Sequence, residues 1–237
     1  MKKLSPVLLT LVWLLWAIPA VANVTVGLPS DANAGNEYPF GYTYNAEYQQ
    51  VYSSSQFRGP ITITNLEFFN TQVDRGATAL PSGNWKISLS TTSADWNTLS
   101  TTYSLNIGSN NTEVFSGDLS QPWAFGDKLS ISLRTPFTYN PANGNLLMDV
   151  IGSGITGSSE VFFDTNGYNR GAFNGNNYMG RVYKSNGDPS ASTFVDKGYG
   201  LVTEFSTGSA VPEPGSMLLL GLGLAGLAAF RMKSRRA

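Results

Sequence analysis

Four aromatic residues stand at alternate positions near the start of an aromatic-rich segment. Tyr38, Phe40, Tyr42 and Tyr44 share even-numbered parity, so a β-strand over this segment would present all four on one face. Three of them carry hydroxyl groups, which would make a polar core face, and the same array suits stacking against sugar rings. Tyr38, Tyr42 and Tyr44 are therefore candidate glycan-binding residues, and packing in the core is the alternative.

A second candidate region is rich in amides. Asn176, Asn177 and Tyr178 end a stretch that begins at residue 168 and lacks regular alternation, which is typical of a loop. Amide and hydroxyl groups both donate and accept hydrogen bonds, as sugar hydroxyls require. We predict that these three residues assist the tyrosines in binding glycan; a structural role in turns is the alternative.

The composition restricts which residues could catalyse a reaction. The chain has 237 residues and contains no His and no Cys. This excludes serine–histidine and cysteine hydrolases, zinc sites with the usual ligands, and disulfides. A glycosidase needs two carboxylates about 5 to 9.5 Å apart. The acidic residues that we considered are Glu47, Glu67, Asp149, Glu160, Asp164 and Glu204. None stands in a recognisable motif, so we expect no enzyme and no catalytic residues; a secreted glycosidase or polysaccharide lyase that uses carboxylates is the alternative.

Two loops contain oxygen ligands of the kind that calcium prefers. Asp31 and Asn33 alternate in one loop, and Asp164 and Asn166 alternate in another. Neither loop contains the bidentate Glu that completes an EF-hand. We expect no cofactor, with calcium left open at these weak candidate sites; turns closed by Asp and Asn side chains are the alternative.

Alternation of apolar with polar residues predicts the structural elements. Residues 85–90, 128–133 and 201–205 read as half-buried antiparallel strands. The apolar parity changes between residues 61–63 and 66–68, which predicts a bulge near Asn65. Residues 137–139 and 146–148 flank a Pro-Ala-Asn-Gly sequence and read as a hairpin. No helical period is visible between residues 23 and 205, so we predict an all-β domain, a jelly-roll-like β-sandwich.

The N-terminus has the features of a secretory signal peptide. Two lysines precede an apolar stretch, and Ala20 and Ala22 form the small-residue pattern at which signal peptidase cleaves. We predict that residues 1–22 are removed and that the mature protein begins at Asn23.

The C-terminus combines three further features. Pro212, Glu213 and Pro214 precede an uninterrupted stretch of apolar and Gly residues, 217–230, after which the chain is rich in Arg. A helix of that length spans about 21 Å, which is short for a transmembrane helix. The basic residues favour the cytoplasmic side. A plain C-terminal membrane anchor is the alternative reading.

This C-terminal arrangement resembles the PEP-CTERM sorting signal of Gram-negative bacteria. The resemblance covers about 27 of the 237 residues, from Val211 onward, and leaves the family of the central domain unrecognised. It implies that an exosortase processes the chain near Pro212–Pro214 after export. It also implies inner-membrane anchoring before processing, and a place at the cell surface or in the exopolysaccharide matrix of a biofilm afterwards.

The predicted layout is a signal peptide (1–22), a β-sandwich domain (23–205), a linker (206–210) and a sorting and anchoring segment (211–237). Residues 23–210 contain 9 Lys and Arg against 15 Asp and Glu, a net charge of −6, which excludes a nucleic-acid partner. The expected partners are signal peptidase, the exosortase and extracellular polysaccharide. The expected function is non-catalytic attachment to that polysaccharide.

Overall fold

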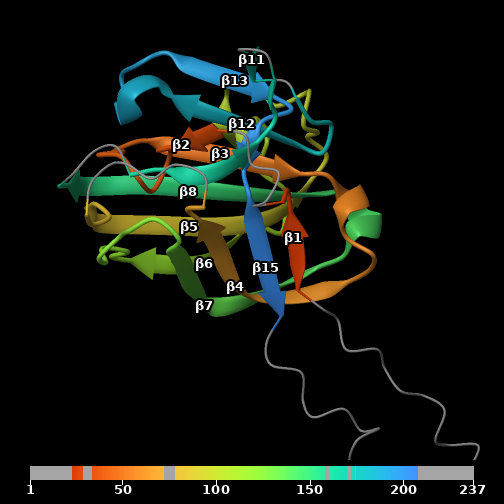
Figure 1. Ribbon diagram of the computed structural model, residues 1–237. Coiled ribbons are helices and arrows are strands. Elements are labelled where there is room, and N and C mark those ends of the chain that lie inside the picture. The colour runs from red at the N-terminus through yellow and green to blue at the C-terminus, as the bar shows by residue number, and fades with distance from the viewer. Residues whose placement is uncertain are drawn as a thin grey trace, which may run out of the picture. The chain divides into compact units, whose positions relative to one another are not determined.

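The computed structural model describes residues 23–28, 34–71, 78–157, 161–169, 172–173 and 175–207, and Figure 1 shows their arrangement. Residues Asn23–Gly208 form one compact unit, so the described residues lie within it. The strands are β1 (Val24–Val26), β2 (Ala34–Asn36), β3 (Glu47–Tyr52), β4 (Ile61–Phe69), β5 (Ser82–Thr92), β6 (Thr112–Gly117), β7 (Lys128–Tyr139), β8 (Asn145–Thr156), β9 (Phe163–Asn166), β10 (Tyr168–Asn169), β11 (Ala172–Phe173), β12 (Met179–Lys184), β13 (Thr193–Lys197), β14 (Gly200–Leu201) and β15 (Thr203–Thr207). Short 3-10 helices are η3 (Ser54–Gln56), η4 (Tyr103–Leu105), η5 (Pro141–Asn143) and η6 (Ser185–Gly187).

Eight of these strands form a jelly roll. One sheet has the order β1-β15-β4-β7, and the other contains the consecutive strands β3-β8-β5-β6. The first and last strands of the domain therefore pair with each other, and the chain passes repeatedly between the two sheets, as in a double Greek key. All pairings in these sheets are antiparallel. The predicted all-β sandwich is confirmed.

Strands β9 to β14 form an insertion between β8 and β15 in the chain, and β2 lies between β1 and β3. Strands β12 and β13 extend the second sheet at the β3 edge, where β13 is outermost (Figure 1). Strands β14, β9 and β2 form a small three-stranded sheet, and β10 pairs with β11. The insertion thus contacts the N-terminal part of the domain through both β2 and β3.

The core lies between the two jelly-roll sheets. Inward-facing side chains of β3, β5 and β8 pack with those of β4, β7 and β15 in one continuous apolar cluster. Its largest fully buried members include Trp85, Tyr48, Tyr52, Phe68 and Phe205. Burial of this apolar surface stabilises the domain.

The predicted bulge near Asn65 is confirmed. The register between β4 and β7 shifts between Ile63 and Asn65, which is the predicted irregularity. The turn at Asn186 and Gly187 has the two positive φ angles, 52° and 61°, that favour an Asn-Gly pair. This turn lies in the connection between β12 and β13, which pair as neighbours.

Three local predictions differ from the structure. The hairpin around residues 141–144 is wrong, because β7 pairs with β4 whereas β8 pairs with β3 and β5, so η5 carries the chain from one sheet to the other. The segment from Tyr38 to Tyr44 forms turns and irregular backbone, not a strand. Ser206 and Thr207, placed in the linker by sequence, belong to β15, where Thr207 pairs with Ile63.

Candidate functional site

Four aromatic side chains form a continuous row at the β12–β13 edge, which we call the aromatic row: Tyr42, Tyr38, Tyr183 and Phe194. The distances between successive ring centroids along the row are 5.5, 5.6 and 5.9 Å. Tyr183 and Phe194 are direct cross-strand partners, and their rings are nearly parallel, at 29°. Phe194 is 47% exposed, and the other three side chains are partly buried. The row therefore offers aromatic surface to solvent.

The segment that carries Tyr38 and Tyr42 is held against the β12–β13 turn. The backbone N–H of Asn45 donates to the carbonyl of Gly187 at 2.9 Å. A Cβ at Gly187 would lie 2.7 Å from Cα of Tyr44, and the φ of Gly187 is +61°. Glycine is required at this position both by its backbone conformation and by the close approach of the neighbouring chain.

Tyr44 lies beneath the row and is fully buried. Its hydroxyl donates to the carbonyl of Glu47 at 3.0 Å and accepts from the backbone N–H of Lys184 at 2.8 Å. Burial raises the pKa of Tyr44. Its ring centroid is 5.2 Å from that of Tyr38. Of the three predicted tyrosines, two reach the surface and Tyr44 supports them from the core.

A buried arginine stabilises the inner side of the row. The guanidinium of Arg181 lies 4.5 Å from the ring centroids of both Tyr183 and Tyr199. Its Nε and Nη2 each contact Oδ2 of Asp196 at 2.8 Å, and its Nη1 donates to Oδ1 of Asn36 at 2.7 Å. Arg181 is only 1% exposed. The carboxylate and the two rings thus compensate for burying the positive charge.

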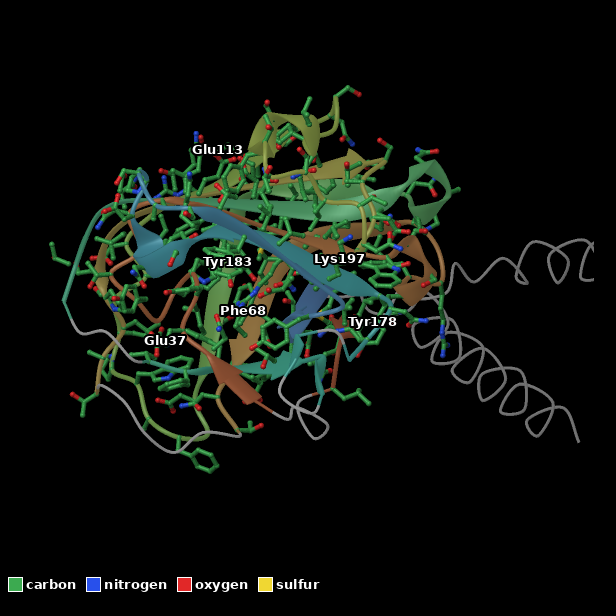
Figure 2. All side chains as sticks on the ribbon, turned by 90° about the horizontal axis from the view of Figure 1, so that it is seen from above. Glu37, Phe68, Glu113, Tyr178, Tyr183 and Lys197 are labelled. Atoms are coloured by element: carbon green, nitrogen blue, oxygen red, sulfur yellow. The ribbon has the colours of Figure 1, made fainter. Side chains whose placement is uncertain are left out.

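The predicted amide region lies elsewhere. Oδ1 of Asn176 accepts from the backbone N–H groups of Tyr178 and Met179, and its Nδ2 donates to the carbonyl of Asn166. Asn177 is exposed. Tyr178 precedes β12, whereas Tyr183 is near its other end, about 17 Å along the strand, and Figure 2 shows the two apart. The structure therefore does not bring these residues together with the row.

The calcium candidates have structural contacts where they are described. The two carboxylate oxygens of Asp164 accept from the backbone N–H and the hydroxyl of Thr71, at 2.8 and 2.6 Å. Oδ1 of Asn166 accepts from the backbone N–H of Leu28 at 2.8 Å. Asp31 and Asn33 lie outside the described residues. Within the described ranges, no three acidic side chains cluster in a way that could hold a metal ion.

Two of the candidate acids, Glu47 and Asp149, are in hydrogen-bond contact with each other. Nε2 of Gln49 lies 3.2 Å from both Oε1 of Glu47 and Oδ1 of Asp149. Desolvation by burial, together with Asp149, raises the pKa of Glu47 to about 8. Burial also raises the pKa of Asp149.

A covering segment, residues 93–111, lies over this carboxyl pair. Nδ2 of Asn106 donates to Oε1 of Gln49 at 2.9 Å. Beside these polar contacts, Trp96 and Leu99 of the segment pack with Val51 and Leu147 on the outer face of the sheet. The covering segment makes the central strands β3 and β8 buried on both faces.

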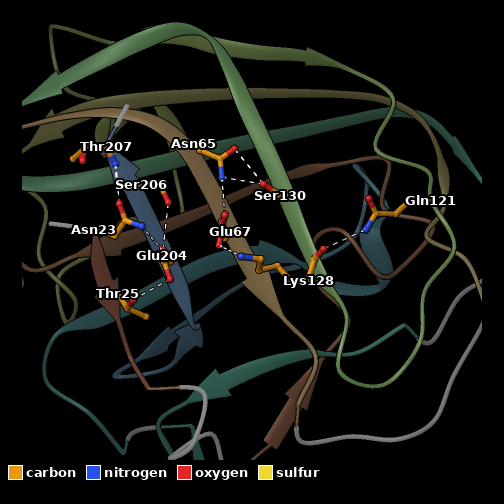
Figure 3. A network of polar contacts seen from close by, with 10 residues as sticks. All are labelled: Asn23, Thr25, Asn65, Glu67, Gln121, Lys128, Ser130, Glu204, Ser206 and Thr207. Carbon is orange, nitrogen blue, oxygen red and sulfur yellow. Dashed lines mark hydrogen bonds and ion pairs between the residues drawn. The ribbon is translucent and has the colours of Figure 1, made fainter. Parts of the chain in front are cut away.

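Glu67 and Glu204 lie on the outer face of the four-stranded sheet, directly opposite each other on β4 and β15. Figure 3 shows their contacts: Lys128 pairs with Glu67, and Nδ2 of Asn23 donates to Oε1 of Glu204 at 2.7 Å. Asn65 also donates to Glu67. These contacts compensate for the repulsion that two facing carboxylates would otherwise cause. Glu160 lies outside the described residues.

Sequence reasoning missed Tyr183, Phe194, Arg181 and Asp196. Arg181 and Tyr183 are two positions apart, and so are Phe194 and Asp196. Alternation could therefore have placed the members of each pair on the same face of a strand. The pairing of β12 with β13, which joins the two faces, is not visible in that local pattern.

Comparison with known proteins identifies the C-terminal signal. Residues 210–236 match the family model described as the PEP-CTERM protein-sorting motif. No curated protein matches the chain. The motif marks an exported protein that is processed by an exosortase and sorted to the cell envelope. The predicted signal peptide and C-terminal helix lie outside the described residues, and among those that the structure describes no helix is long and apolar enough to cross a membrane.

Proposed function

We propose that this exported, exosortase-sorted protein attaches non-catalytically to extracellular polysaccharide and remains in the surface matrix after processing. The sorting motif at residues 210–236 supports the destination. The observation that carries the binding role is the aromatic row, in which two of the predicted tyrosines lie with an exposed phenylalanine. Aromatic faces can cover the apolar C–H face of a sugar ring while its hydroxyls remain in water.

Binding by one domain should be weak. A site of a few aromatic side chains is expected to bind at about millimolar strength, which corresponds to roughly −4 kcal/mol. Many copies on one surface would convert weak contacts into firm attachment, because each additional contact is made at high effective concentration. Weak binding by a single domain therefore agrees with the proposal.

Retention on polysaccharide from the producing cells tests the proposal. The secreted form should be immobilised on beads at high and at low density and mixed with that polysaccharide. We expect retention at high density that falls steeply at low density, with no release of new reducing ends during incubation. Absence of retention at any density would reject polysaccharide binding in favour of a passive matrix role. Release of reducing ends would reject the non-catalytic assignment.

A further inference from the structure

We infer that the aromatic row is the polysaccharide-contacting surface and that it favours neutral over anionic polysaccharides. This inference rests on the function proposed above and specifies its site and the chemical class of its ligand. It adds Tyr183 and Phe194 to the binding residues and excludes Tyr44, which is fully buried.

The geometry of the row suits a sugar ring on the outer face of Phe194. One face of the Phe194 ring stacks on Tyr183, which is in turn covered on another side by the guanidinium of Arg181. Phe194 is nevertheless 47% exposed, so part of its surface is open to solvent. Tyr38 and Tyr42 continue the row with their rings at 81° to each other, so Phe194 offers the stacking face and the two tyrosines add partly exposed aromatic surface beside it.

The charges next to the row do not favour an anionic ligand. The basic residues of β12 and β13 are Arg181, Lys184 and Lys197. Arg181 is buried, and its charge is balanced by Asp196. Lys184 and Lys197 have the opposite strand parity to Tyr183 and Phe194, so they point to the other face of the sheet. Nζ of Lys184 also donates to the carbonyl of Ala191. These two strands therefore direct no solvent-exposed positive charge to the row's face.

The net charge of the domain also disfavours an anionic ligand. Residues 23–210 have a net charge of −6. A polyanion that approaches the row is repelled, and added salt screens that repulsion over about 10 Å at 0.1 M ionic strength. A neutral polymer experiences no such force, so its binding should depend little on salt.

Matched variants separate the row from general surface hydrophobicity. Phe194→Ala removes the exposed ring of the row. Phe125→Ala removes a ring that is exposed to a similar extent, 51%, but lies on the β6–β7 connection. Because both side chains are exposed, neither variant should change the melting temperature appreciably. Tyr42→Ala provides a second test at the other end of the row.

The secreted forms should be displayed on beads at high density and offered a soluble neutral β-glucan or alginate, each in about 0.02 M and about 0.5 M NaCl. We expect the glucan to be retained independently of salt, with retention about tenfold lower for Phe194→Ala and Tyr42→Ala and unchanged for Phe125→Ala. Alginate should be retained more weakly than the glucan, and least at low salt.

Three outcomes would overturn the inference. Alginate retention that exceeds glucan retention, or that is greater at low salt than at high salt, would contradict the assigned ligand class. Equal loss in Phe194→Ala and Phe125→Ala would contradict the assigned site. A wild-type protein that sediments as a dimer, together with a Phe194→Ala variant that sediments as a monomer, would show that a second copy of the chain covers the row. Retention of the cells' own polysaccharide together with any of these results would leave the proposed function intact, whereas absence of all retention would reject both.

Discussion

Replacing Glu47 by Gln should reduce a pH dependence of stability that the carboxyl pair creates. In the folded protein the pKa of Glu47 is raised to about 8, first by desolvation and then by the adjacent Asp149. In the unfolded chain the pKa of Glu47 should be near its ordinary value of 4.5. The folded state therefore holds more protons between these pH values, and the free energy of unfolding falls as pH rises through that window.

The size of this effect follows from the shift and from the exposure of the group. A difference between pKa values of about 4.5 and about 8 corresponds to at most about 5 kcal/mol. Glu47 is only partly buried, so solvent screening reduces this figure, and we expect a loss of about 2 kcal/mol between pH 5 and pH 8.5. The contribution is complete below about pH 4.5 and absent well above pH 8.

Glu47→Gln keeps the shape of the side chain and retains a donor for Asp149, but it does not titrate. Its free energy of unfolding should fall less than that of the wild-type protein between pH 5 and pH 8.5, the remaining fall coming from Asp149, whose pKa burial also raises. It should exceed that of the wild-type protein at the upper end. Urea titrations followed by tryptophan fluorescence measure this, because Trp96 lies in the covering segment that contacts Gln49 through Asn106. Glu113→Gln, at an exposed glutamate of β6, serves as the matched control and should keep the wild-type profile.

If the free energy of unfolding of Glu47→Gln fell as much as that of the wild-type protein between pH 5 and pH 8.5, this reasoning would be refuted, because the titrating group would then lie elsewhere. A wild-type protein whose stability rises between pH 5 and pH 8.5 would contradict the assigned direction of the shift.

Further predictions concern the ion pair, the candidate calcium loop and the two ends of the chain. Asp196→Asn should lower the free energy of unfolding by about 3–5 kcal/mol in urea titrations, because the buried Arg181 loses its charged partner. Asp188→Asn, at an exposed aspartate, serves as the control. A loss below about 1 kcal/mol in Asp196→Asn would contradict the role of the pair. Chelation of calcium should change the melting temperature by less than about 1 °C, because both oxygens of Asp164 already accept hydrogen bonds; a fall of several degrees would show that calcium binds the folded protein. N-terminal sequencing of the exported protein should begin at Asn23, and a start at Met1 would reject signal cleavage. The intact mass of the form released in the native host should lack the C-terminal arginines, and their presence would reject processing near the sorting motif.

Local patterns in the sequence were sufficient for the fold class and the destination. Alternation over residues 85–90 and 128–133 predicted half-buried strands, because successive side chains of a strand point to opposite faces. The change of parity at Asn65 predicted the bulge for the same reason. The sorting motif is contiguous in sequence and needs no folded partner to be recognised.

The pairing of strands was not available from such patterns. Residues 146–150 are buried without alternation, because β8 has the core on one face and the covering segment on the other. The local sequence around residues 141–144 is compatible with a hairpin or with a crossing between sheets. The pairing of β8 with β3 and β5, and of β7 with β4, decides for the crossing.

The sequence by itself determined an all-β exported chain, the sorting motif and the presence of tyrosines suited to a surface or a core. The tertiary structure decided that Tyr44 is core, that Tyr38 and Tyr42 continue into Tyr183 and Phe194, and that Glu47 meets Asp149. The reason is that alternation records which side chains share a face of one strand, whereas these contacts join segments far apart in the chain. Their formation depends on which strands pair, and pairing is selected by the burial of the whole domain.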